Sequence, residues 1–93
     1  MLDLTKKYSV NPEIVVQELE GQTALLNPDN GQIFGLDVVS SRVWELIELH
    51  SIVGKVKSSM MDDFDVEESR LDKDLEVYIQ QLLELELIRG IDE

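Results

Sequence analysis

The side chains that could support acid–base, nucleophilic or metal chemistry are unevenly represented in this chain. It contains twenty Asp and Glu residues but a single histidine, His50, and no cysteine. The lack of cysteine excludes disulfides, thiolate metal sites, iron–sulfur clusters and a cysteine nucleophile, and it is typical of a reducing compartment. The HExxH, GxSxG, P-loop and GxGxxG motifs are also missing from the sequence. Catalysis would therefore have to come from carboxylates and one imidazole.

The carboxylates do not form a recognisable site either. The acidic stretch MMDDFDVEES, residues 60–69, lacks the DxDxDG spacing and central glycine of a calcium loop. His50 falls at the end of a predicted helix, where a cationic side chain is favoured by the helix dipole. No nucleophile, base and orienting group can be assigned together. We therefore expect a protein that is not an enzyme and has no cofactor and no metal.

The length and net charge of the chain narrow the possible classes of protein further. Ninety-three residues with 43% hydrophobic side chains predict one globular domain over residues 1–93. No signal peptide and no apolar run near the ~20 residues of a membrane span occur, so we expect a cytoplasmic protein with no membrane partner. A net charge of −12 argues against nucleic-acid binding, which requires clustered Lys and Arg. The acidity fits either plain solubility or a basic or neutral peptide partner.

The elements that would position a site can be read from the spacing of apolar residues. Residues 1–12 are expected to be a flexible lead-in that ends at a turn. Three apolar runs follow at 14–19, 23–26 and 32–36, separated by EGQ and NPDNG, which supply turn-forming residues. Such short links predict an antiparallel meander. Three strands are too few to close on themselves, so helices must cover one face.

Three helices are predicted in the remainder of the chain. Asp37 is placed to cap a helix that runs to about residue 49, with Val39 and Val43 on its apolar stripe and Trp44 at the margin. Ser51 is expected to cap a second helix that extends to residue 64. The third begins at Glu67 and runs to about residue 85, and the chain becomes extended at residues 87–88.

The third helix has a polar flank that contains one apolar residue. Its core face comprises Leu71, Leu75, Tyr78, Leu82 and Leu85. Val77 lies outside this face, beside Arg70, Asp74 and Gln81. A single exposed valine usually needs no explanation, but it could also belong to a contact surface.

A meander followed by three helices is compatible with two kinds of binding protein. In a winged-helix nucleic-acid binder the third helix would present cations, but here it carries Arg70 and Lys73 among many acids. In a peptide binder, a partner strand would pair with a free sheet edge. The third strand bears Ile33, Phe34 and Leu36 and no edge-protecting lysine or proline. Such an edge could also pair with a second copy, so both a monomer and an edge-paired homodimer are compatible with the sequence.

The stretch TALLNPDNGQIFGLDVVSSRVWELI, together with the last helix, resembles the PqqD-like family, the peptide-recognition elements of ribosomal peptide natural-product pathways. The resemblance extends from residue 14 to residue 88. It is carried by an ordered set of positions: Gly31, Phe34, Leu36, Asp37, Val43, Trp44, Asp74, Leu82, Leu87 and Ile88. The NPDNG hairpin resembles the stand-alone members of lasso-peptide pathways.

The resemblance implies an α+β, winged-helix-like fold of three strands and three helices, and a role in binding the leader segment of a precursor peptide. The leader would add as a strand antiparallel to the third strand and would then be delivered to a modifying enzyme, either a leader peptidase with a cyclase or a radical enzyme. Gly35 would allow close approach of the incoming backbone. The implied groove has one wall on the third strand and one on the third helix: Gln32, Ile33, Phe34, Gly35 and Leu36; Arg70, Asp74, Val77, Tyr78 and Gln81. The alternative hypothesis is an acidic regulatory or scaffold domain that binds another protein through a helix face.

Overall fold

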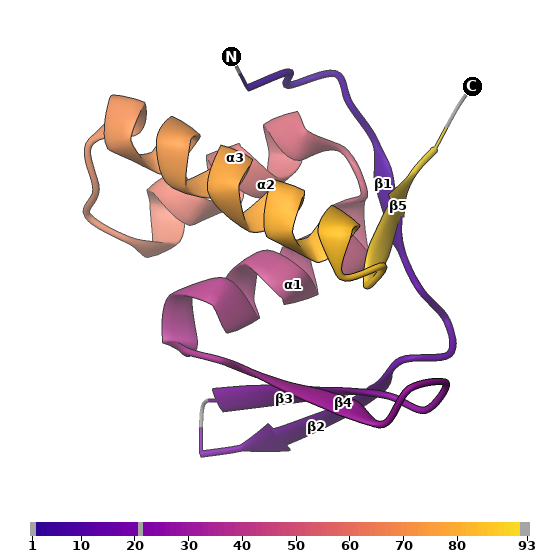
Figure 1. Ribbon diagram of the computed structural model, residues 1–93. Helices are drawn as coiled ribbons and strands as arrows, with labels where there is room; N and C mark the ends of the chain where they lie inside the picture. Colours follow the sequence, from indigo (N-terminus) through magenta and orange to yellow (C-terminus); the bar gives the residue numbers. More distant parts are fainter. Residues whose placement is uncertain (1, 21, 92–93) are drawn as a thin grey trace.

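The computed structural model describes residues 2–20 and 22–91 and places three helices over one face of a small sheet (Figure 1). The sheet is antiparallel, and its strands follow the order β2 (Val15–Leu19), β3 (Gln22–Asn27) and β4 (Gln32–Leu36). The helices are α1 (Val38–His50), α2 (Val53–Asp63) and α3 (Glu68–Glu84). The predicted α+β fold, a three-stranded antiparallel sheet followed by three helices, is confirmed.

The hairpin between β3 and β4 forms at the predicted NPDNG turn. Gly31 adopts a φ of 73°, a conformation that glycine reaches without steric cost, and its N–H donates to the Asn27 carbonyl over 2.8 Å. The Asn27 side chain accepts from the Asp29 N–H at 3.0 Å, and the Asn30 side chain accepts from the Gln32 N–H at 2.9 Å. These local bonds set the register in which Asn27 pairs with Gln32.

The change from β4 to α1 occurs at one residue. The Asp37 carboxylate accepts from the Ser40 N–H at 2.8 Å, and the Asp37 N–H donates to the Ser40 hydroxyl at 3.2 Å, which together form a capping box. The predicted N-cap is confirmed. Because the cap satisfies the backbone groups at the junction, β4 needs no loop before the helix.

Ser41 fastens the same junction to the sheet. Its buried hydroxyl accepts from the Thr23 N–H at 3.1 Å and donates to the Leu36 carbonyl at 3.2 Å. Thr23 and Leu36 are cross-strand partners at the ends of β3 and β4. One side chain therefore holds the start of α1 against both strands.

The connection between α1 and α2 differs from the prediction. Ser51 lies at φ 63° and ends α1, with its N–H donating to the Ile47 carbonyl at 3.0 Å. The expectation that Ser51 caps the second helix is wrong, because Ile52 holds the N-cap position of α2 and makes no side-chain cap. Backbone carbonyls from the N-terminal segment take that role. Val53 and Gly54 donate to the Lys6 and Leu4 carbonyls over 3.0 and 2.9 Å.

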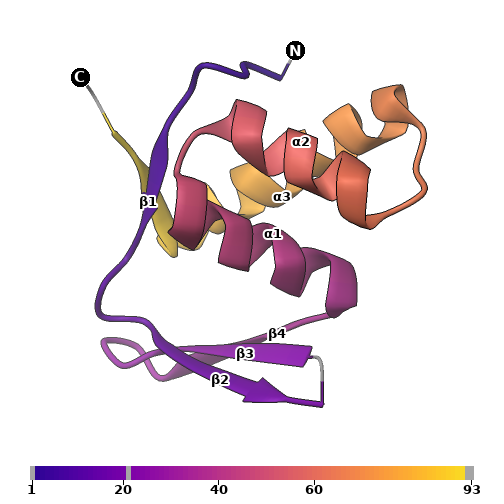
Figure 2. The ribbon, with the colours of Figure 1, turned by 180° about the vertical axis from the view of Figure 1, so that it is seen from behind.

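The segment expected to be a flexible lead-in contains a strand. β1 (Tyr8–Val10) pairs antiparallel with β5 (Ile88–Gly90), so two strands from opposite ends of the sequence lie side by side (Figure 2). Tyr8 is buried against the core and its N–H donates to the Ser51 carbonyl at 3.0 Å. This N-terminal segment is thus held in place by the burial of Tyr8 and by pairing with a strand some eighty positions away. Local turn signals in the sequence predict neither the burial nor the pairing. The predicted extension after the third helix does occur, beginning at Ile88.

The core is formed where α1 packs against the sheet on one side and against α2 on the other, and α3 adds buried side chains to it. Trp44, expected at the margin of the α1 stripe, is 1% exposed, whereas Val39, expected within the stripe, is 37% exposed. Trp44 is buried because α1 packs against both the sheet and α2 and therefore buries more than one stripe. The buried apolar side chains are Tyr8, Ile14, Leu25, Val43, Trp44, Leu46, Ile47, Val53, Val56, Met60, Leu71, Leu75, Ile79, Leu82, Leu87 and Ile88.

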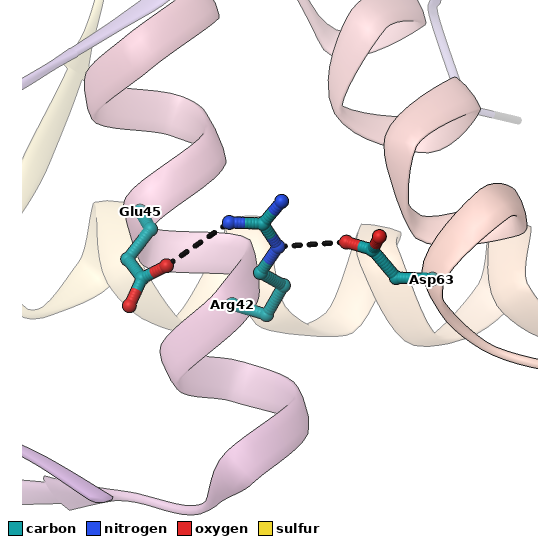
Figure 3. Close-up of polar contacts among 3 residues, drawn as sticks. All are labelled: Arg42, Glu45 and Asp63. Atoms are coloured by element: carbon teal, nitrogen blue, oxygen red, sulfur yellow. Dashed lines mark hydrogen bonds and ion pairs between the residues drawn. The ribbon is translucent and has the colours of Figure 1, made fainter. Parts of the chain in front are cut away.

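Ion pairs join the helices at their surfaces. Arg42 on α1 reaches Asp63 at the end of α2 over 2.7 Å and Glu45 on its own helix over 3.1 Å (Figure 3). These hydrogen bonds raise the pKa of the Arg42 guanidinium. The pairs are partly exposed, so each contributes less than about 1 kcal/mol to stability. Of these two pairs, only Arg42–Asp63 joins α1 to α2, because Glu45 belongs to the same helix as Arg42.

Candidate functional site

β4 is an open edge of the three-stranded sheet, because β3 is its only strand partner among the described residues. Its side chains alternate between two faces, as the pleat requires. Phe34 and Leu36 pair with the buried residues Leu25 and Thr23 and pack against the core. Ile33 points to the opposite face and is 69% exposed. β4 is therefore fixed on its inner face and available along its outer backbone.

A cavity of about 220 Å³ lies between β4 and α3. Its lining is mostly apolar, with a hydroxyl and an amide among the polar groups. The residues come from β4, from the start of α1, from the last turns of α3 and from the segment that follows: Phe34, Gly35, Leu36, Ser40, Val43, Tyr78, Gln81, Leu82, Leu85 and Leu87. A groove of this kind could bury apolar side chains from a strand that lies alongside β4.

Tyr78 provides a polar group in this groove. Burial raises the pKa of its phenol, and the Asp37 and Asp74 carboxylates raise it further, while a hydrogen bond with the Ser40 side chain opposes the rise. The phenol is therefore neutral at physiological pH and can donate or accept a hydrogen bond. Asp37 and Asp74 act on it from two different elements, which brings negative charge to one part of the groove.

The structure brings together half of the residues predicted for the groove. Five of them line the cavity: Phe34, Gly35, Leu36, Tyr78 and Gln81. Gln32 and Ile33 lie on the β4 edge next to the hairpin and do not line the cavity. Arg70, Asp74 and Val77 lie on exposed parts of α3, earlier along the helix, and Val77 is 55% exposed.

Gly35 leaves open space where a side chain would otherwise stand. A Cβ atom at this position would meet no other heavy atom within 4 Å among its non-neighbouring residues. Its cross-strand partner is Ala24, another small residue. A shallow depression of about 320 Å³ passes over this pair on the sheet. The glycine is thus not required by packing within the chain, and the space beside it remains free.

Sequence reasoning missed five lining residues: Ser40, Val43, Leu82, Leu85 and Leu87. Val43 and Leu82 fall at helical spacing and were assigned to the core, and both are buried. They form the floor of the cavity as well as part of the core. Ser40 gives no sequence signal other than its place three residues after Asp37, the N3 position of a capping box.

Other kinds of site find no support in the part of the chain that is described. No group of three or more His, Asp or Glu side chains there could hold a metal ion. Across residues 2–20 and 22–91, none of the helices is both long and apolar enough to cross a membrane.

Comparison with known proteins adds an independent observation. Residues 22–88 match the family described as coenzyme PQQ synthesis protein D (PqqD). The chain belongs to the PqqD family. The match begins at β3 and ends in β5, so it includes β4, all three helices and the cavity between β4 and α3.

Two solved structures share the fold of this PqqD-family protein. One is TbiB1 in complex with the TbiA(beta) leader peptide, with a TM-score of 0.83, 25% identity, and coverage of 91% of this chain and 99% of that chain. The other is a lasso peptide synthetase B1 complexed with the leader peptide, with a TM-score of 0.80 and 17% identity over 89% of this chain and 98% of that one. A comparison with curated protein sequences gave no match.

Proposed function

We propose that this PqqD-family protein binds the leader segment of a ribosomally made precursor peptide and delivers it to a modifying enzyme. The leader would add as a strand antiparallel to β4, with apolar side chains in the groove against α3. The observation that carries the proposal is the close structural likeness to TbiB1, which was solved with a leader peptide bound. The open β4 edge and the apolar cavity beside it supply the physical means.

The binding site would combine backbone pairing with side-chain recognition. Gln32 to Leu36 would supply backbone hydrogen bonds, which are insensitive to the leader sequence. Specificity would come from the cavity lined by Phe34, Tyr78 and Gln81 and from the exposed flank formed by Arg70, Asp74 and Val77. Because β4 is anchored at the Asp37 junction and at the hairpin, the edge is already in place before the peptide arrives. A preorganised edge reduces the ordering cost of binding.

The protein itself would be non-catalytic and cytoplasmic, and the chemistry would belong to its partner. The likeness to lasso peptide synthetase B1 favours a leader peptidase with a cyclase as that partner over a radical enzyme. The alternative of an acidic scaffold that binds through a helix face is not favoured, because it leaves the β4 edge and the groove without a role.

The test is a titration of the isotope-labelled protein with a synthetic leader peptide, taken from a short precursor reading frame to be sought beside its gene. Changes in backbone amide chemical shifts are a better readout than tryptophan fluorescence, since Trp44 is buried away from solvent. We expect the largest shifts in β4 and the second half of α3. Shifts concentrated on α2 and the β1–β5 pair would contradict the assigned site.

Matched variants sharpen this test. Val77→Asp introduces a charge at an exposed apolar position on α3, and Leu49→Asp makes the same change on α1, where Leu49 is 72% exposed. We expect Val77→Asp to weaken leader binding roughly tenfold, about 1.4 kcal/mol, and Leu49→Asp to leave it unchanged. Gln32→Pro removes the N–H that donates to the Asn30 side chain in the hairpin, so it should loosen the anchored end of β4 and thereby weaken binding. Equal effects of the two Asp variants would mean that only net charge matters.

A further inference from the structure

The three-stranded sheet has a second free edge, formed by β2. β2 lies at the opposite end of the sheet from β4, and its only strand partner within the described residues is β3. Val15 is 49% exposed and Val16 is 38% exposed. Val16 pairs with Leu25, which is fully buried, so the two residues share the face that carries the helices. α1 packs against β3 and β4, and the inner face of β2 therefore remains partly uncovered.

This edge lacks the lysine, proline and bulge that often protect sheet edges from pairing, and its one charged residue is Glu18, which lies on the same face as Val16 and disfavours pairing with an acidic strand. The strand reads VVQEL, five residues without lysine or proline. Native proteins usually blunt an exposed edge with such residues, with a bulge or with a covering loop. The register between β2 and β3 is continuous over all five residues, so no bulge interrupts it. The leader site on β4 does not require an open β2, and the feature therefore needs a separate explanation.

The charge around β2 indicates which partner would fit. The stretch from Tyr8 to Ser41, which includes the whole sheet, has five acidic residues and no Lys or Arg. Glu18 of β2 lies close enough to Glu48 of α1 to affect it. The pKa of Glu48 is raised first by burial and also by the Glu45 and Glu18 carboxylates, while the Trp44 side chain opposes the rise. A second copy would place the same acids opposite one another, whereas a basic strand would neutralise them.

We propose that the β2 edge binds an extended, positively charged segment of the modifying enzyme, which adds as a further strand. This inference rests on the proposed delivery function. With a spacing of about 4.8 Å between strands, a leader on β4 and an enzyme strand on β2 would lie about 19 Å apart, separated by the three strands of the sheet. The two partners would not compete, and the sheet would hold them at a fixed distance from each other.

The test measures the affinity of the protein for two ligands separately: the modifying enzyme encoded beside its precursor gene, and the synthetic leader peptide. Val16→Lys and Glu18→Lys place a cation on the β2 edge, and Ile33→Lys does so on the β4 edge as the matched control. We expect each β2 variant to weaken enzyme binding about tenfold or more and to leave leader affinity within about twofold. Ile33→Lys should weaken leader binding instead. Glu18→Gln should give a smaller loss, and higher salt should weaken enzyme binding by the wild type.

Thermal unfolding would verify that each variant is folded, and Glu18→Lys is an exposed change that serves if Val16→Lys disturbs packing. Unchanged enzyme affinity in folded Glu18→Lys and Val16→Lys proteins would overturn the inference, as would a wild-type protein that does not bind the enzyme. A wild-type dimer in sedimentation that Val16→Lys dissociates would assign the edge to a second copy and also overturn it. The proposed function is tested separately by the leader titration. A wild-type protein that does not bind the leader peptide would contradict the proposed function, whatever its affinity for the enzyme.

Discussion

The buried hydroxyl of Ser41 makes a testable contribution to both stability and binding. In the Ser41→Ala variant the Thr23 N–H would lose its acceptor, and Thr23 is 3% exposed, so water cannot easily replace the lost bond. A buried donor without a partner costs about 1–3 kcal/mol. The Leu36 carbonyl would also lose a donor, but Leu36 is only half-buried and can recruit water. We therefore expect the free energy of unfolding to fall by about 1–3 kcal/mol.

Chemical denaturation and thermal scans would measure this loss, which corresponds to about 4–8 °C in Tm for each kcal/mol in a domain of this size. Ser58→Ala is the matched control because Ser58 is exposed on α2, and it should change stability by less than about 0.5 kcal/mol. Hydrogen exchange should show faster exchange of the Thr23 amide in Ser41→Ala. Leader affinity should also fall, since Ser41 holds the end of β4. Equal stability of the two serine variants would refute the assignment of Ser41 as the link between α1 and the sheet.

Two further predictions concern the ends of α1 and α2. Asp37→Ala removes the N-cap of α1 and should lower the free energy of unfolding by about 1 kcal/mol in denaturant titrations, while Asp37→Asn should retain most of it. Hydrogen bonds from the Ser40 side chain and amide lower the pKa of Asp37. The contribution of its charge is therefore fully present above the unfolded pKa near 4 and is lost as pH falls through the lower pKa of the folded state. The stability gap between wild type and Asp37→Asn should therefore narrow as pH falls from about 5 toward the acid limit of folding; a constant gap would contradict this. Gly54→Ala would place a Cβ 3.1 Å from the Leu4 carbonyl oxygen and should speed hydrogen exchange of the residue 54 amide, although a helix-propensity gain of up to about 1 kcal/mol offsets the change in overall stability. Unaltered exchange at that amide would show that the N-terminal segment accommodates the methyl group.

Local chemistry explains which parts of the fold could be predicted. Asp37 and the NPDNG hairpin act through side chains that bond to amides two or three residues away, so their roles follow from spacing alone. The pairing of β1 with β5 depends on two three-residue strands at opposite ends of the chain, and no local signal selects that contact. The same applies to Ser41, whose hydroxyl reaches Thr23 eighteen residues away. A serine next to a helix start is ordinary, and only the tertiary structure gives it a partner.

The β4 wall of the candidate site could be predicted from the sequence, whereas the α3 wall could be predicted only in part. The β4 wall followed from a short apolar run with no edge-protecting residue. The α3 wall was implied by the family resemblance, and a helical wheel carries no information about where along its axis the helix meets the sheet. Arg70 precedes Tyr78 by eight residues, which places it about 12 Å further along the helix. For this reason Tyr78 and Gln81 line the cavity, whereas Arg70, Asp74 and Val77 stand on the flank.

The position of β4 in the chain favours a rigid docking edge over a mobile one. At one end, the hairpin is locked by the Asn30 side chain and by the left-handed Gly31. At the other, Asp37 caps α1 and Ser41 bonds to the Leu36 carbonyl. Strand addition requires the incoming peptide to lose its own conformational freedom, about 1–2 kcal/mol for each residue that becomes ordered. An edge that also had to be ordered would roughly double that cost over the paired length, so anchoring at both ends would favour the proposed binding of a short leader segment.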